Sequence, residues 1–150
     1  STANDWAITG VQLEVGEYTS STIPPFQHES YGDNLARCQR YFYEMVVNEA
    51  ESGNSPLGLG MYYNTSQMMF DVFFPVQMRT NPTLSTASAT NAFQLLSNNA
   101  ADYLDDFVLD KVNSNVAELK NSTDASGTAG MAGTVRTSSG GDSVSFSAEL

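Results

Sequence analysis

Cysteine and histidine are nearly absent from this sequence, which contains one of each, Cys38 and His28. A lone cysteine cannot form an intramolecular disulfide, and no zinc-type spacing of cysteine and histidine occurs. Cations are also few: six Lys and Arg oppose seventeen Asp and Glu, and the net charge is −11. Such a chain repels phosphate, so we expect no nucleic acid partner. Long apolar runs are missing, so we expect no membrane insertion.

What is present favours β-structure, most clearly in residues 68–79. Six apolar side chains alternate there on one side of the chain: Met68, Phe70, Val72, Phe74, Val76 and Met78. A period of two is typical of a strand with one face in a core. The opposite side is mixed, and its Phe73 is expected to be covered in part or to meet a partner. Pro75 lacks an N–H, so the strand must lie at an edge, bulge or turn away there.

Similar short patterns recur along the chain. They predict strands within 5–15, 41–47, 57–61, 83–87, 92–96, 107–112, 116–120 and 144–150, and a short one at Val135. Asp33 is interpreted as the N-cap of one helical turn. Residues 98–107 are ambiguous, because they would also suit a single amphipathic helical turn. We therefore predict an all-β fold, an antiparallel β-sandwich of jelly-roll type with roughly eight to ten short strands and little helix.

The chain is predicted to have two parts. Residues 1–32 would be an N-terminal strand and an extended connector that ends an upstream domain, because 16–32 has two prolines and no period. Residues 33–150 would form a C-terminal β-sandwich domain. The sequence begins at Ser1 without Met, which we interpret as a cut end. A flexible loop is expected at 121–133 and a turn at Gly140-Gly141.

Several stretches resemble segments of virion structural proteins of tailed bacteriophages. The first three are 6–16 (WAITGVQLEVG), 26–31 (FQHESY) and 35–42 (LARCQRYF). Residues 74–83 (FPVQMRTNPT) are similar to that family's FPVxMRxxPT segment, and 146–150 (FSAEL) to its terminal FxAEL. The matches follow the family's order and spacing, and none is found between 84 and 142.

The resemblance implies a non-enzymatic tail-fibre, capsid-fibre or decoration protein, often preceded by a β-sandwich like a carbohydrate-binding module. It implies several copies on the surface of the virion, and we expect a homotrimer. The expected partners are other copies of the chain, capsid or tail proteins, and a host surface glycan. No cofactor is expected. The resemblance does not choose among positions on the particle.

Aromatic side chains are the candidate glycan or interface residues. Strand aromatics are usually core or interface residues, but their ring faces also match the apolar side of a sugar. The candidates for glycan or interface contacts are Tyr62, Tyr63 and Phe73, and further rings that could offer platforms are Trp6, Tyr41 and Tyr43. A carbohydrate-binding module that reads host glycans is therefore an alternative function.

Charged residues and the remaining polar groups suggest structural roles. Arg37, Arg40 and Arg79 are half of all cations and are expected to pair with carboxylates within the fold or across a subunit boundary. The densest acidic cluster is Asp102, Asp105, Asp106 and Asp110. It lacks the residue order of a calcium loop, so we interpret it as a solvated stretch and predict no metal site.

No residue pattern predicts catalysis. We interpret His28 as a surface histidine and Cys38 as a buried small apolar residue, because neither belongs to a nucleophile motif. A polysaccharide hydrolase would need a pair of carboxylates at a set separation. Any two of the seventeen could form such a pair, and the sequence does not give the distance between them. That activity stays as a second alternative to a non-enzymatic function.

Overall fold

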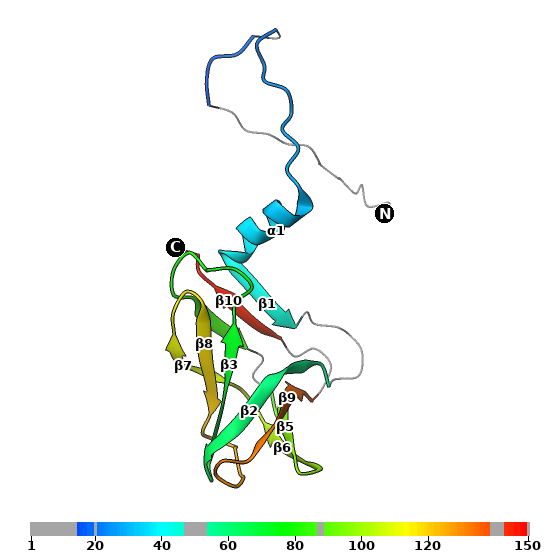
Figure 1. The fold of residues 1–150 in the computed structure, drawn as a ribbon, viewed down its shortest axis with the longest axis vertical. Coiled ribbons are helices and arrows are strands. Elements are labelled where there is room, and N and C mark those ends of the chain that lie inside the picture. The colour runs from blue at the N-terminus through cyan, green and yellow to red at the C-terminus, as the bar shows by residue number, and fades with distance from the viewer. Residues whose placement is uncertain (1–14, 20, 47–53, 87–88, 139–142, 150) are drawn as a thin grey trace, which may run out of the picture.

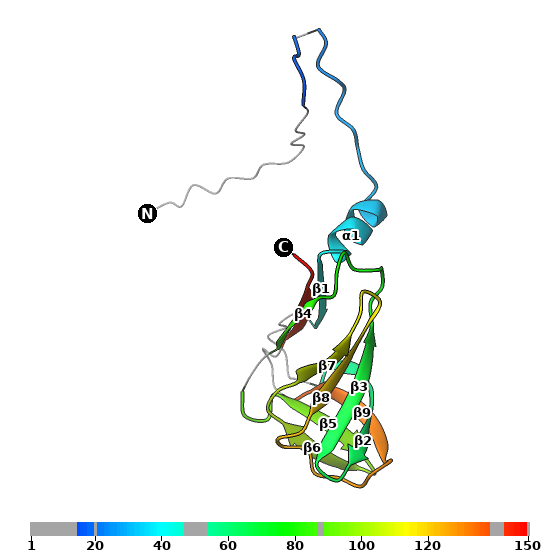
Figure 2. The same cartoon turned by 90° about the vertical axis from the view of Figure 1, so that its left-hand side faces the viewer.

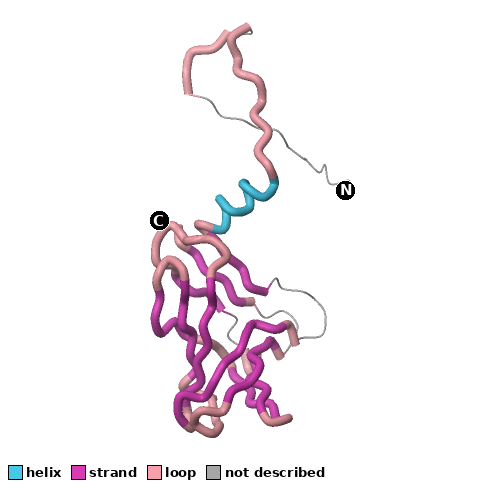
Figure 3. Tube along the Cα trace, viewed as in Figure 1, coloured by secondary structure: helices cyan, strands magenta, loops and turns pink. Residues whose placement is uncertain are grey.

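The computed structural model describes residues 15–19, 21–46, 54–86, 89–138 and 143–149. Within them it has ten β-strands and one short α-helix, so the all-β prediction is confirmed (Figure 3). In chain order the elements are α1 (Tyr31–Gln39), β1 (Phe42–Val46), β2 (Pro56–Asn64), β3 (Gln67–Phe73), β4 (Thr83–Thr86), β5 (Phe93–Ser97), β6 (Ala100–Leu104), β7 (Val108–Val112), β8 (Val116–Asn121), β9 (Ala132–Thr137) and β10 (Val144–Ser147).

The strands form two antiparallel sheets (Figures 1 and 2). The smaller sheet has the order β1-β10-β4, and the larger has the order β6-β5-β9-β2-β3-β8-β7. A hairpin joins β2 and β3, with Tyr62 opposite Met68. The two sheets are consistent with a sandwich, whereas the jelly-roll connection order stays a prediction.

The larger sheet encloses most of the core by curving on itself. Side chains of β3 alternate, so that Met68, Phe70 and Val72 are buried. The ring of Phe107 packs against Phe70 from β3 at 5.0 Å and against Phe93 from β5 at 4.6 Å between centroids. Strands β3 and β5 are three places apart in the sheet, so only a curved sheet can bring their rings to one point.

The smaller sheet closes one side of the same core through aromatic contacts. Phe146 on β10 is fully buried, and its ring lies 5.0 Å from that of Phe74, which directly follows β3. Tyr43 on β1 contacts both rings, at 6.5 Å from Phe146 and 6.1 Å from Phe74. Aromatic pairs at such separations stabilise beyond their buried area. This cluster therefore joins the two sheets.

The strand predicted over 68–79 ends earlier, because β3 stops at Phe73. Pro75 follows two residues later and cannot continue a ladder, as its missing N–H had indicated. The chain bends there, and the Met78 amide donates to the carbonyl of Ser114 at 2.8 Å. Met78 is nevertheless buried. The prediction that Met78 faces the core is therefore correct, whereas the prediction that the strand extends to Met78 is wrong.

Helix α1 is longer than the predicted turn and begins at a different cap. Ser30, not Asp33, is the N-cap: its Oγ accepts a hydrogen bond from the Asp33 amide at 3.1 Å. The connector therefore ends before Tyr31, within the range predicted as 16–32. None of the nine residues of α1 is buried, and the helix and the preceding segment project from the sheets (Figure 2).

The ambiguous range 98–107 contains a strand. Strand β6 pairs with β5, with Leu104 opposite Phe93, and Leu104 is fully buried. The helical-turn alternative is therefore wrong, because the neighbouring strand supplies hydrogen-bond partners that a local pattern cannot reveal. Two other predictions lie outside the described residues: almost all of the strand at 5–15, and the turn at Gly140-Gly141.

Candidate functional site

The outer face of β2 and β3 carries large apolar side chains in water. Because alternate residues of β3 fill the core, Met69 and Phe73 point the other way, and Phe73 is 74% exposed. On β2, Leu59 is 79% exposed and Met61 is also exposed. Met61 lies opposite Met69 in the β2 and β3 pairing. The exposed apolar side chains of the two strands therefore share one face.

This face contains a shallow groove of about 500 Å³, which we call the acidic groove. Its lining residues are apolar apart from two carboxylates, and they are Leu59, Gly60, Met61, Met69, Phe70, Phe73, Ala132, Asp71 and Glu118. Scattered exposed apolar residues are normal on a protein surface, but a contiguous group of them in a groove indicates an interaction site. The acidic groove is the first part of the candidate site.

The two carboxylates of the acidic groove lie on neighbouring strands, and among the described residues neither has a Lys or Arg nitrogen within 4.0 Å. Asp71 on β3 is directly opposite Glu118 on β8. Lys111 lies opposite Glu118 on β7 and offsets its charge only in part, because Lys111 and Lys120 both donate to Asp110. Burial raises the pKa of Glu118, and the carboxylates of Asp110 and Asp71 raise it further. A cationic side chain placed in the groove would therefore be stabilised by these carboxylates.

A second surface has the opposite character, and we call it the arginine patch: Arg40, Tyr41, Phe42 and Arg79. The Arg79 amide donates to the Arg40 carbonyl at 2.7 Å, which holds the two residues together. The guanidinium of Arg79 lies over the Tyr41 ring, 5.6 Å from its centroid. All four residues are exposed. In the described part of the chain, neither arginine has a carboxylate within 4.0 Å.

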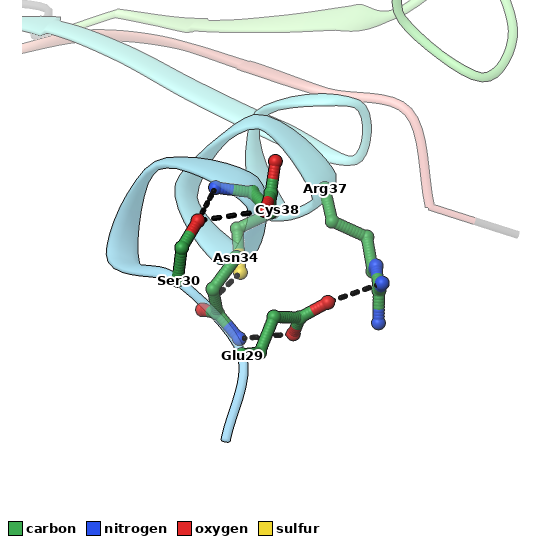
Figure 4. Close-up of polar contacts among 6 residues, drawn as sticks. Glu29, Ser30, Asn34, Arg37 and Cys38 are labelled. Atoms are coloured by element: carbon green, nitrogen blue, oxygen red, sulfur yellow. Dashed lines mark hydrogen bonds and ion pairs between the residues drawn. The ribbon is translucent and has the colours of Figure 1, made fainter. Parts of the chain in front are cut away.

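Arg37, the third predicted pairing residue, is used locally. It forms an ion pair with Glu29, whose other oxygen accepts from Asn34 at 3.1 Å (Figure 4). Cys38 was predicted to be buried, which is wrong: it is exposed, and its thiol donates to Asn34 Oδ1 at 3.7 Å. The reason is that α1 packs no face into the core, so a small apolar side chain on it has nowhere to be buried.

Tyr62 is not an available aromatic platform, contrary to the prediction. It is only 2% exposed, and its hydroxyl donates to Asp102 Oδ2 at 2.8 Å. Burial, together with the hydrogen bond to Asp102 and the charge of that carboxylate, raises the pKa of the phenol well above its usual range. The adjacent Tyr63 points outward and is 66% exposed. Of this pair only Tyr63 can meet a ligand.

The other predicted rings differ in accessibility. Tyr41 is exposed within the arginine patch, whereas Tyr43 is half-buried between the sheets. Trp6 lies outside the described residues. His28 is exposed and its ring meets that of Phe26 edge to face, with centroids 4.8 Å apart.

Three of the four acidic side chains at 102–110 have separate partners. Asp102 accepts the Ser126 amide at 2.8 Å. Asp105 accepts the Asn91 amide at 2.8 Å, and Asp110 binds the two lysines described above. Over the described ranges, no three His, Cys, Asp or Glu side chains are grouped so that they could hold a metal ion.

The chain matches no protein-family model, no curated protein and no solved structure. Among the described residues, no helix has both the length and the apolar character needed to cross a membrane. The candidate site is therefore defined by its geometry alone.

Sequence reasoning missed the acidic groove, although one signal was available. Leu59 and Met61 alternate with Gly58 and Gly60, and the larger residues are the ones that face outward. A Cβ on Gly60 would meet Val135 Cγ2 and lie 3.1 Å from Met68 Cε. Glycine is needed on the inner side because those side chains already fill the core there.

Proposed function

We propose that this chain is a non-enzymatic structural component of a tailed-bacteriophage particle, of the fibre, spike or decoration type, located on the virion surface. The observation that carries the proposal is the apolar face of β2 and β3, which the described residues of one chain leave exposed. Residues 6–42, 74–83 and 146–150 resemble segments of such proteins, and this resemblance supports the assignment to a bacteriophage particle.

Assembly in several copies is the physical core of the proposal. Leu59 and Phe73 are largely in water in the single chain, and burying each would contribute about 1.5–3 kcal/mol. The net charge of −11 opposes unspecific association of copies. Specific contacts over this face would overcome that repulsion, and we propose a homotrimer that also contacts capsid or tail proteins.

The experiment measures the mass of the full chain by sedimentation velocity over a wide concentration range. We expect a trimer for the natural sequence and a monomer for Phe73→Ser, because that change places a hydroxyl on the covered face. The matched control is Tyr103→Ser, which alters an exposed ring on the edge strand β6 and should leave the trimer intact. Purified particles should contain the chain in a copy number divisible by three.

Two results would contradict the proposal. The first is a chain that stays monomeric at all concentrations. The second is a purified phage particle that does not contain this chain.

Glycan reading is a second candidate, favoured by one observation. Tyr63, near the end of β2, has an exposed ring on which the apolar side of a sugar could stack. A glycan array should then show binding that is lost in Tyr63→Ala and kept in Phe73→Ser. Binding that survives Tyr63→Ala would exclude this ring as the platform.

A further inference from the structure

We propose that the acidic groove of one copy binds the arginine patch of a second copy of this chain. The inference rests on the proposed function, because it names the contact through which the copies assemble. Both surfaces combine two like charges with exposed apolar side chains, and their charges are opposite. Each surface therefore offers what the other lacks.

The charge of the acidic groove is only partly offset within its own chain, by Lys111, which lies opposite Glu118 on β7. Asp71 and Glu118 are directly opposite in adjacent strands, a position where like charges destabilise a sheet. Asp110 engages Lys111 and Lys120, so these cations are already committed. Once a second copy covers the groove, its apolar side chains would exclude water and so strengthen an ion pair formed there.

The arginine patch is suited to supply that cation. Arg40 and Arg79 are adjacent, and no described carboxylate lies within ion-pair distance of either. A guanidinium binds a carboxylate through two parallel hydrogen bonds, so two arginines can match two carboxylates. The exposed rings of Tyr41 and Phe42 beside them would pack on the apolar wall formed by Leu59 and Phe73.

A second copy fits this contact better than an unrelated partner does. A three-fold ring requires two different complementary surfaces on each chain, because every copy meets its neighbours head to tail. The acidic groove and the arginine patch are such a pair: the groove lies on the larger sheet, and the patch lies where α1 leads into β1 of the smaller sheet. The patch also holds two of the six cations of a chain with net charge −11. The repulsion between two copies is therefore smallest when one copy approaches the other with its arginine patch.

The test reverses the charges of each surface in the full chain. One variant carries Asp71→Lys and Glu118→Lys, and another carries Arg40→Glu and Arg79→Glu. Either variant alone places like charges in the contact, which should weaken trimer formation about 100-fold. The variant with all four changes restores opposite charges and should form trimers within about threefold of the natural affinity. Circular dichroism checks that each variant is folded.

The matched control is Glu29→Arg with Arg37→Glu, which exchanges the two charges of an ion pair outside both surfaces and should leave association unchanged. If the natural chain forms trimers and both reversed variants do so equally well, the contact is wrong and the proposed assembly stands. If both reversed variants fail to form trimers and the variant with all four changes also fails, the pairing of these two surfaces is wrong. A natural chain that never associates overturns both proposals.

Discussion

Removing the hydroxyl of Tyr62 tests whether this buried side chain ties distant parts of the fold together. Tyr62 lies on β2, and Asp102, which accepts its hydrogen bond, lies on β6 at the far edge of the same sheet. The same carboxylate oxygen accepts the Ser126 amide from the loop before β9. In Tyr62→Phe the ring still fills its place, so the variant isolates the hydrogen bond.

The expected loss of stability is about 1.5 kcal/mol. Hydrogen bonds to charged groups contribute about 1.5–3 kcal/mol, and the lower end applies because Asp102 keeps the Ser126 amide. For a chain of this size, 1 kcal/mol corresponds to about 4 °C in Tm, so Tm should fall by about 6 °C. Urea unfolding gives the free energy directly, with an unchanged slope if only the native state is affected.

The matched control is Tyr63→Phe, which removes the same atom from the neighbouring exposed ring and should change the free energy of unfolding little. Alkaline pH gives a second signature, because the raised pKa of Tyr62 keeps its phenol protonated in the folded chain. The unfolded phenol ionises near pH 10, so the stability of the natural chain should fall as pH rises above about 10. Tyr62→Phe should reduce this dependence. Equal stability losses in the two variants would refute the reasoning.

Two further changes test the packing of the core and the charge of the acidic groove. Gly127→Ala would push a methyl group into the ring of Tyr62 and should cost about 2 kcal/mol in urea unfolding, whereas Gly32→Ala meets nothing within 4 Å and should cost nothing. Glu118→Gln should stabilise the monomeric Phe73→Ser chain by about 0.5 kcal/mol at neutral pH, because the raised pKa means that ionised Glu118 is disfavoured in the folded state. That gain should vanish below about pH 4, where the carboxyl is protonated in both states, and a gain that persists there would contradict the electrostatic explanation.

The period-two pattern was sufficient to predict most strands, because it reflects a local property of the backbone. Alternation in β3 follows from having one face in a core, and Pro75 marks where its ladder can no longer continue. The pattern was less informative at α1. Ser30 and Asp33 are both good N-caps, and the local sequence does not decide which of them begins the helix.

Strand pairing decided the features that a local pattern leaves open. Residues 98–107 suit a strand or a helical turn, and β6 forms because β5 lies beside it with Phe93 opposite Leu104. Tyr62 and Tyr63 are adjacent and chemically identical. The pairing of Tyr62 with Met68 turns the first into the core and the second into water.

The amino-acid sequence by itself determined that this chain is built of short strands with apolar sides, because alternation needs only neighbouring residues. The tertiary structure alone decided which charges meet. Asp71 and Glu118 are 47 positions apart and come together through the register of β3 and β8. Arg40 and Arg79 are joined by a hydrogen bond between the end of α1 and the bend after β3. Such contacts depend on how strands pair across the whole chain, and no local pattern records them.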